Sequence, residues 1–495
     1  MQKILLIRAY IPVGVGGPVH PLELLYISSR IRKSSKDNYE IKIIDMGIGQ
    51  LSVPEIDKEI RSLNPTVICL NALVWEAQLV HEIAEVVKKF NKNINLIICG
   101  QLPTLAGENM LFEKNIDFLV IGEPEITVAE LVIAIDNKKK FSDVPGIIYR
   151  DGDDIITTKP RAYIDDLDSA GISSSEWDLI DVRAYAKYAN WNGMLKESFY
   201  IPIITSRGCP FNCTFCCYRN SYGSSFRMRS PENVILEIKF LQKKYDVREI
   251  HIFDAVFNYD IERAKKICEL IIDSKIKISL AFPHGIRADI MTDELIVLLK
   301  KAGTYKLTYG IETAVSRLQK ETRKNLNLPL VKQVISKTAK TGIIVGGYFM
   351  LGFPAETEQE MRQTIDFALT SDLDIASFFK VSCFQDIGKI YQSKYLDVSK
   401  NINYDFEDLT YFSRKRSNTE ICARSLNNII IEAQQRFYIN PRRLWRGICK
   451  SPHKLGFLQK LMTAVGLLLQ AYLMRKLEDS VPIRNNTPNA EEVEK

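Results

Sequence analysis

Three cysteines within eight residues are the strongest chemical signal in this sequence. Cys209, Cys213 and Cys216 have the spacing C-x3-C-x2-C and follow an apolar run that predicts a β-strand. Thiolates on such a tight loop can bind one small, soft metal centre, and three of them on a four-iron cluster leave one iron free for another ligand. The pattern therefore predicts a [4Fe-4S] cluster held by these three cysteines.

Two simpler uses of the same thiols fit the sequence less well. A structural zinc site needs four ligands, and the nearest fourth thiol, Cys217, is adjacent to Cys216 and poorly placed to reach the same ion. No histidine lies within thirty residues of the triad. A thioredoxin-like dithiol uses two cysteines and would leave Cys209 without a role.

The triad, with Phe215 before its last cysteine, resembles the signature of the radical S-adenosylmethionine (SAM) superfamily. The resemblance implies that the free iron chelates the amino and carboxylate groups of SAM, while the aromatic residue backs the adenine. It also implies reductive cleavage of SAM to a 5′-deoxyadenosyl radical, which abstracts hydrogen from an unactivated carbon. The protein would align the cofactors and exclude water and oxygen.

Motifs further along the chain extend this resemblance. Residues 310–313, Gly-Ile-Glu-Thr, are similar to the family's Gly-Ile-Glu-Ser strand end, and residues 347–357 are similar to its Gly-x-Pro-Gly-Glu-Thr element. Each is weak alone, because a Gly or Glu at a strand end is usually a turn or a cap, but their order behind the triad is specific. The resemblance implies SAM contacts from Phe215, Asp254, Arg287, Gly310, Glu312, Gly352 and Pro354.

The N-terminal half resembles the cobalamin-binding subgroup of the superfamily, which joins a Rossmann-like B12 domain to the barrel. The matching segments are residues 21–29, 100–104, 122–125 and 165–168. The resemblance implies that loops at the strand ends hold the corrin, through Asp45, Asn71, Gly100, Thr104, Gly122 and Glu123.

One departure from the B12 pattern concerns the cobalt ligand. The Asp-x-His-x-x-Gly motif reads Asp45-Met46-Gly47-Ile48-Gly49 here and contains no histidine. We interpret His20 and His81 as surface or packing residues. The sequence therefore predicts cobalamin bound without a histidine lower ligand, and loss of the cofactor is the alternative.

The elements that must position these residues follow from the hydrophobic pattern. Residues 1–140 alternate β-branched apolar runs with amphipathic helical patterns, which predicts an α/β, Rossmann-like, doubly wound parallel sheet with ligands beyond its strand ends. Residues 141–198 are predicted to be a linker with a hairpin at Asp151-Gly152. Residues 199–395 hold six more strand and helix units, typical of a partial (β/α)6 barrel.

The end of the chain has a different character. Residues 396–476 are predicted to be helical and basic, and residues 477–495 a disordered tail. The net charge is +6, yet residues 414–476 carry thirteen basic and two acidic side chains, a local charge of +11. The apolar stretch 457–474 carries Lys460 and is shorter than the ~20 residues that a membrane span needs.

This basic region has three interpretations: helices packed on the barrel, an interfacial helix attracted to anionic lipid, or an RNA-binding stripe. RNA-modifying relatives of this barrel carry further cluster cysteines in their N-terminal domain. Here Cys69 and Cys99 each lie inside an apolar strand, so nucleic acid is the weaker case.

Composition limits the class of protein. A length of 495 residues corresponds to about three domains, and ten cysteines are too sparse for a disulfide scaffold, which favours a reducing compartment. The first apolar run is too short for a signal peptide. We expect a cytoplasmic protein, and membrane association through its basic region is the alternative.

Together these observations predict an enzyme: a B12-dependent radical SAM protein that methylates a carbon of an apolar small molecule such as a lipid, polyprenoid or tetrapyrrole. An electron donor of the flavodoxin or ferredoxin type would reduce the cluster. Two alternatives stay open, a radical SAM cyclase or rearrangement enzyme on the same architecture, and a non-catalytic cobalamin or iron-sulfur sensor.

Overall fold

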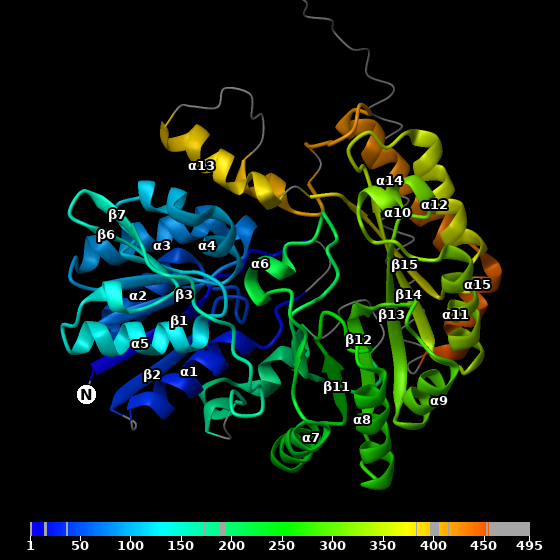
Figure 1. Cartoon of the computed structure of the whole chain (residues 1–495), viewed down its shortest axis with the longest axis horizontal. Helices are drawn as coiled ribbons and strands as arrows, with labels where there is room; N and C mark the ends of the chain where they lie inside the picture. Colours follow the sequence, from blue (N-terminus) through cyan, green and yellow to red (C-terminus); the bar gives the residue numbers. More distant parts are fainter. Residues whose placement is uncertain are drawn as a thin grey trace, which may run out of the picture.

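The computed structural model describes residues 2–13, 17–35, 38–172, 175–188, 195–382, 384–396, 405–413, 415–451 and 454. Two α/β units stand side by side, and a helix that follows the second unit returns to lie over the first (Figure 1).

The first unit is a seven-stranded sheet with the order β2-β1-β3-β4-β5-β6-β7. Its first five strands are parallel, and helices bury both faces, as a parallel sheet requires. The strands are β1 (Gln2–Arg8), β2 (Tyr39–Asp45), β3 (Val67–Asn71), β4 (Asn95–Cys99), β5 (Phe118–Val120), β6 (Ile147–Asp151) and β7 (Asp154–Thr157). Helices α1 (Leu22–Ser35) and α5 (Pro124–Asp136) cover one face, and α2 (Val53–Leu63), α3 (Ala77–Phe90) and α4 (Gln101–Ala106) cover the other. The predicted doubly wound sheet is confirmed.

The hairpin β6-β7 turns at Gly152-Asp153, one residue later than predicted, and it does not stand apart in a linker. It pairs antiparallel with β5 and extends the first sheet at one edge. The chain then runs through two short 3-10 helices, η4 (Glu176–Leu179) and η5 (Val182–Lys187), on its way to the second unit.

The second unit is an open barrel of six parallel strands in the order β15-β14-β13-β12-β11-β8. The strands are β8 (Ile201–Ile203), β11 (Glu249–Ile252), β12 (Ser279–Ile286), β13 (Thr304–Glu312), β14 (Ile344–Leu351) and β15 (Ile375–Lys380). The helices are α7 (Pro231–Tyr245), α8 (Ile261–Asp273), α9 (Asp293–Lys301), α10 (Ser316–Glu321), α11 (Leu328–Lys340) and α12 (Glu358–Thr370). Strands β9 (Ser206–Arg207) and β10 (Arg227–Met228) form a small antiparallel ribbon, and helix α6 (Tyr218–Tyr222) lies in the segment that connects them. The predicted partial barrel is confirmed.

The segment after β15 joins the two units. Helix α13 (Ile387–Leu396) packs on the first unit, where the buried Tyr391 hydroxyl hydrogen-bonds to Nε2 of His81 at 2.9 Å (Figure 1). Phe406 and Leu409 of the 3-10 helix η8 (Phe406–Leu409) enter the same hydrophobic core.

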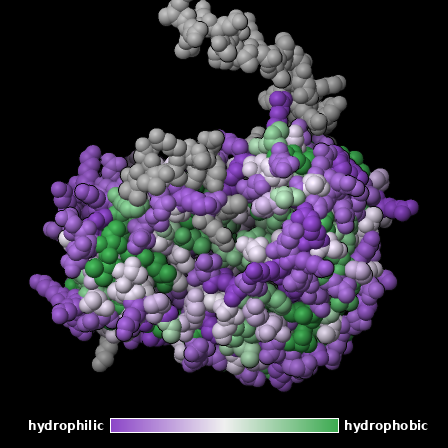
Figure 2. Space-filling model, turned by 45° about the horizontal axis from the view of Figure 1, so that its top comes forward, coloured by the Kyte–Doolittle hydropathy of each residue, from purple (hydrophilic) through white to green (hydrophobic). Residues whose placement is uncertain are grey.

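Helices α14 (Ala423–Tyr438) and α15 (Pro441–Lys450) pack on the outside of the barrel. Several basic side chains of this region bind barrel groups in that packing. Arg443 donates to backbone carbonyls in and after α12, such as Leu369 O at 2.7 Å, while Arg446 and Lys450 pair with the buried Asp374 at 2.9 and 2.8 Å. Figure 2 shows hydrophilic side chains over most of the face drawn, with hydrophobic ones in separate patches.

No helix in the part of the chain that the structure describes is long and apolar enough to span a membrane. The apolar stretch 457–474 and the predicted tail 477–495 lie outside the described residues.

Candidate functional site

The cysteine loop lies between β9 and α6, and its path depends on Gly208. This glycine has φ +79°, and a Cβ atom there would lie 1.9 Å from the carbonyl oxygen of Ser225. Only glycine therefore permits the close approach of the two chain segments. The loop closes through Cys209, whose backbone N–H donates to Gly223 O at 3.2 Å.

The three predicted cluster ligands lie near one another and are partly buried. Burial raises the pKa of the Cys216 thiol to about 12, and Cys213 and Cys209 add to that effect through their own charge. Burial also raises the pKa of Cys213, while Lys324 and Arg287 oppose this effect. Three thiolates thus need positive charge in this loop, which a bound metal centre supplies.

The chemistry of this donor set fits the predicted cluster. A four-iron cluster attaches three thiolates to three of its irons and leaves the fourth iron free, whereas a structural zinc site needs four ligands. Cys209, Cys213 and Cys216 supply three soft donors on one short loop. The residues present therefore fit a [4Fe-4S] cluster.

Glu312 ends β13 beside the cysteine loop in a strained conformation. Its φ is +68°, and the strand pairing shifts between Gly310 and Glu312. Such strain in a non-glycine residue persists only where the surroundings enforce it, often at functional sites. A Cβ on Gly310 would lie 2.8 Å from Oε1 of Glu312, so this glycine leaves room for the carboxylate.

The partner of Glu312 is Lys324, which the sequence analysis missed. Its Nζ lies 3.2 Å from Oε1 of Glu312, and both side chains are almost buried. Lys324 follows α10 in a loop with no motif around it, so only the tertiary structure reveals it. Arg287 lies beside the cysteine loop. It pairs with Asp289 at 2.7 Å, and its guanidinium carbon lies 3.7 Å from the ring centre of Phe211, a residue of that loop.

The turn at residues 352–354 is organised by Glu356. Its Oε2 accepts from the backbone N–H groups of Gly352 at 2.6 Å and Phe353 at 2.9 Å, and Gly352 has φ +88°. The ring centres of Phe353 and Phe215 are 5.9 Å apart, which brings this turn to the cysteine loop. The Pro354 side chain is exposed.

Asp254 follows β11 and is already engaged with the chain. Its carboxylate accepts from Thr205 N, at 2.6 Å, from Thr205 Oγ1, at 2.5 Å, and from Ser206 Oγ, at 2.6 Å. These bonds anchor the segment that leads into the cysteine loop. The geometry thus gives Asp254 a positioning role, while its predicted contact with SAM stays a prediction.

Four of the predicted cobalamin residues form one patch at the carboxyl ends of β3, β4 and β5. Thr104 Oγ1 donates to Gly100 O at 2.8 Å and accepts from Gly122 N at 3.1 Å. A Cβ on Gly100 would lie 2.7 Å from Nδ2 of Asn71. Glycines at two of the strand ends leave backbone surface on which a flat macrocycle can lie closely, so this edge fits a corrin.

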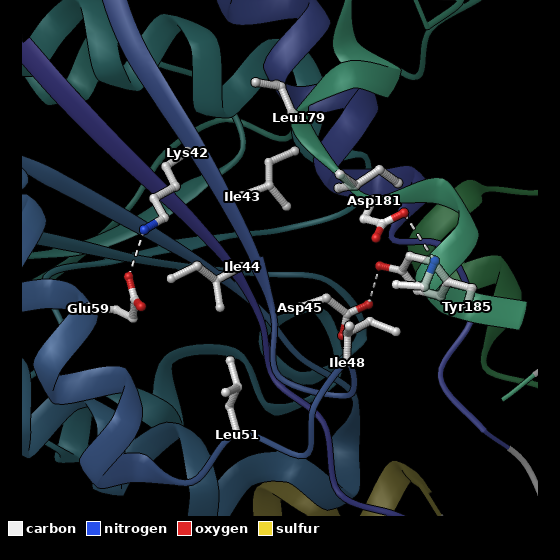
Figure 3. Close-up of a pocket in the computed structure, with 12 residues that line it drawn as sticks. Lys42, Ile43, Ile44, Asp45, Ile48, Leu51, Glu59, Leu179, Asp181 and Tyr185 are labelled. Atoms are coloured by element: carbon white, nitrogen blue, oxygen red, sulfur yellow. Dashed lines mark hydrogen bonds and ion pairs between the residues drawn. The ribbon is translucent and has the colours of Figure 1, made fainter. Parts of the chain in front are cut away.

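Asp45 lies elsewhere, at the carboxyl end of β2, which is the edge strand of the sheet. Its carboxylate pairs with Arg8 at 3.2 Å and accepts from the Tyr185 hydroxyl at 2.8 Å and from Gly47 N at 2.9 Å. A pocket of about 220 Å³ opens beside it, between β2 and residues 179–185 (Figure 3). The structure therefore does not bring the Asp45 carboxylate to the patch formed by the other strand ends.

Glu123 belongs to a buried ion network that joins the two units. It lies 2.9 Å from Arg227 and 3.4 Å from Arg207, and Arg207 also pairs with Glu125 at 2.7 Å; all four side chains are no more than 4% exposed. Arg207 lies two residues before Cys209. The network therefore fixes the cysteine loop against the first unit, a role that sequence motifs did not predict.

Further contacts bring the strand-end patch to the cysteine loop. Gln101, the residue after Gly100, donates from Nε2 to Sγ of Cys217 at 2.9 Å. The Gly122 backbone lies close enough to α6 that its Cβ would be 3.7 Å from Ser221 O. The two predicted cofactor sites are thus adjacent.

The two histidines of the first unit, predicted to be surface or packing residues, are buried and therefore packing residues. His20 stacks on Tyr185 with ring centres 4.1 Å apart and contacts Val182 O at 3.0 Å, and His81 contacts Tyr391. Burial lowers the pKa of His20 to about 3 and that of His81 to about 4.

Comparison with known proteins agrees with this geometry. Residues 203–368 match the family model of the radical SAM superfamily, and residues 11–132 match that of the B12 binding domain. An uncharacterized methyltransferase of Pyrococcus horikoshii is 29% identical over 74% of this chain and 76% of its own. The anaerobic magnesium-protoporphyrin IX monomethyl ester cyclase of Synechocystis is 26% identical over 72% of this chain and 69% of its own.

Among solved structures, the fold is similar to that of the radical SAM methyltransferase TsrM from Kitasatospora setae, with tryptophan and a SAM analogue bound. The TM-score is 0.64 at 16% identity, over 79% of this chain and 76% of TsrM.

The fold and the site define a protein in which an iron-sulfur loop on a partial barrel faces a corrin-binding sheet. The chain belongs to the radical SAM superfamily and carries an N-terminal B12-binding domain. It is a radical SAM enzyme, and its cofactors are a [4Fe-4S] cluster, SAM and cobalamin.

Proposed function

We propose that this enzyme is a cobalamin-dependent methyltransferase that acts on a carbon of an apolar small molecule. The observation that carries the proposal is the direct contact between the corrin edge and the cluster loop, from Gln101 to Cys217 at 2.9 Å. A methyl donor and a radical source must both reach one substrate carbon, so their sites must be neighbours.

The chain's own residues divide the work between the two sites. When bound, the cluster with SAM supplies a carbon-centred radical, and cobalamin carries a transferable methyl group. Cys209, Cys213 and Cys216 would hold the cluster. Phe215 and the 352–354 turn would back SAM.

The polar groups beside the cysteine loop suit the charged end of SAM. The Glu312 carboxylate can accept from an ammonium group, while Lys324 and Arg287 can bind a carboxylate. Gly310 leaves room for the Glu312 carboxylate. Asp254 would orient the loop through Thr205 and Ser206.

The corrin would lie on Asn71, Gly100, Thr104 and Gly122, without a histidine lower ligand. Glu123 would act at a distance, because its carboxylate already binds two arginines. We also propose a cytoplasmic protein that receives electrons from a flavodoxin or ferredoxin. The exposed Trp445 and Ile439 support peripheral membrane contact through the basic region.

Two alternatives remain distinct proposals. A radical SAM cyclase is supported by the similarity to the magnesium-protoporphyrin cyclase. It would form 5′-deoxyadenosine alone, whereas methyl transfer forms S-adenosylhomocysteine as well. A cobalamin or iron-sulfur sensor would bind its cofactors but cleave no SAM after reduction.

The test is anaerobic reconstitution of the full chain with iron, sulfide and cobalamin, followed by reduction in the presence of SAM. We expect cluster absorption near ~400 nm and formation of 5′-deoxyadenosine in the wild type. Both should vanish in Cys213→Ala and persist in Cys268→Ala, which removes a thiol buried in α8. Wild-type protein without cluster absorption or SAM cleavage would refute the proposal.

A further inference from the structure

Several aromatic side chains face the inside of the barrel rather than its outer core. On β11, Ile250 and Ile252 pack in the core under the helices, so the alternate residue Phe253, just past the strand end, faces inward. The same alternation turns Tyr348 inward beside the core residue Phe349, and Phe379 inward beside the core residue Phe378.

These inward rings are only partly buried, although their strands belong to the barrel sheet. Phe253, Tyr348 and Phe379 are half-buried, and His284 is exposed at the end of β12. The His284 ring lies 4.1 Å from that of Phe253, centre to centre. The inside of a filled barrel is covered by packed side chains, so the exposed area of these inward side chains marks open space within the barrel.

The rings continue out of the barrel as one wall. Tyr348 and Phe379 are 5.6 Å apart, Phe379 and Tyr411 are 5.9 Å apart, and Tyr411 and Phe384 are 5.1 Å apart. Phe384 in turn contacts Trp75, just past β3 in the first unit, at 6.1 Å. The wall thus leads from the barrel interior to the sheet edge that fits the corrin.

Tyr411 brings this wall to the cluster loop. Its ring and that of Phe215, a residue of this loop, both pack against one hydrophobic cluster that contains Phe353 and Val381. A molecule held against the wall therefore lies between the two cofactor sites.

We infer that this aromatic wall binds a planar aromatic or conjugated ring, and that His284 hydrogen-bonds the polar edge of that ring. The inference rests on the proposed function and narrows its substrate class. The outer core holds fully covered side chains such as Leu307 and Phe349, whereas the rings of the inner face keep part of their surface open to the barrel interior. Ring on ring contacts favour a flat, conjugated ligand over a flexible aliphatic chain.

The environment of His284 suits a hydrogen-bonding role. Desolvation by the surrounding barrel, with His251 adding to it, lowers the pKa of His284 to about 4, so the imidazole is neutral at pH 7 even though part of its surface is open. A neutral ring offers one donor and one acceptor. His251 itself is held by Glu249 at 2.6 Å.

The experiment measures binding by anaerobic equilibrium dialysis of the cofactor-loaded full chain with SAM. The probes are L-tryptophan, magnesium-protoporphyrin IX monomethyl ester and the aliphatic alcohol farnesol. Phe379→Leu keeps an apolar side chain but removes the ring, and His284→Gln keeps a hydrogen-bonding group. The matched control is Phe367→Leu on α12, whose ring packs on the outside of the barrel near Phe349.

We expect at least one aromatic probe to bind more tightly than farnesol. Phe379→Leu should weaken that binding about tenfold, the upper range for one aromatic contact. His284→Gln should weaken it by a similar factor, and Phe367→Leu should leave it unchanged.

Three results would overturn the inference: farnesol binding as tightly as both aromatic probes, no aromatic binding at all, or aromatic binding that Phe379→Leu does not weaken. SAM cleavage is measured in the same samples. A wild type that binds a ring but cleaves no SAM contradicts the proposed function alone, and one that cleaves SAM but binds no ring contradicts this inference alone.

Discussion

The buried network at the junction of the two units gives a quantitative prediction for Glu123→Gln. The Glu123 carboxylate lies 2.9 Å from Arg227 and accepts from Ile164 N at 2.8 Å, and its side chain is 3% exposed. Removing one partner of a buried ion pair costs about 3–5 kcal/mol, because an uncompensated charge stays buried. Arg207 keeps Glu125 at 2.7 Å, so we expect a loss near the lower limit, about 3 kcal/mol.

The matched control is Glu130→Gln in the same unit. Glu130 also pairs with an arginine, Arg161, but its side chain is 46% exposed. Exposed pairs contribute about 0–1 kcal/mol, because water screens their charges. The measurement is urea unfolding of both variants and the wild type, followed by far-UV circular dichroism.

A second variant separates lost charge balance from lost packing. In the double variant Glu123→Gln/Arg227→Gln both partners of the pair are neutral. This variant should therefore lose less free energy of unfolding than Glu123→Gln and Arg227→Gln lose in sum. The reasoning is refuted if Glu123→Gln destabilises the chain no more than Glu130→Gln does.

Three further predictions concern other parts of the chain. Burial raises the pKa of Glu356 to about 7. The folded chain therefore keeps a proton that the unfolded chain releases near the ordinary pKa of glutamate. The free energy of unfolding should fall by about 3 kcal/mol as the pH rises from 4.5 to 7. Urea unfolding at several pH values should show this slope in the wild type, and an equal slope in Glu356→Gln would contradict it. Asp374→Asn should destabilise the chain by about 3 kcal/mol and loosen α15, since its almost fully buried carboxylate binds two cations of that helix; unchanged hydrogen exchange in α15 would argue against this. Gly208→Ala should abolish cluster absorption, whereas Gly152→Ala, where a Cβ meets nothing within 4 Å, should retain it; a normal cluster in Gly208→Ala would show that the loop tolerates the added atom.

Local patterns were sufficient to predict the fold and the metal chemistry. The alternation of apolar strands and amphipathic helices predicted both sheets, because strands and helices each have their own spacing of hydrophobic residues along the chain. The spacing of Cys209, Cys213 and Cys216 predicted the cluster, because ligands on one short loop need no distant partner. Similarly, Gly100 and Gly122 follow directly after strands whose ends must meet at one sheet edge.

Residues that act across the fold escaped this reasoning. Lys324 pairs with Glu312, and Tyr411 packs against the same hydrophobic cluster as Phe215, from loops that carry no motif. Glu123 lay in a motif that suggested a cofactor contact, yet its carboxylate binds two arginines of the other unit. The charge of the basic region likewise proved to be partly matched by barrel groups such as Asp374.

The amino-acid sequence by itself determined the two α/β units, their order and the cysteine triad, because these depend on residues that are neighbours along the chain. Only the tertiary structure decided how the corrin edge meets the cluster loop and which rings face the space between them. Such contacts join residues hundreds of positions apart, and their formation depends on the packing of whole elements, which no local spacing encodes.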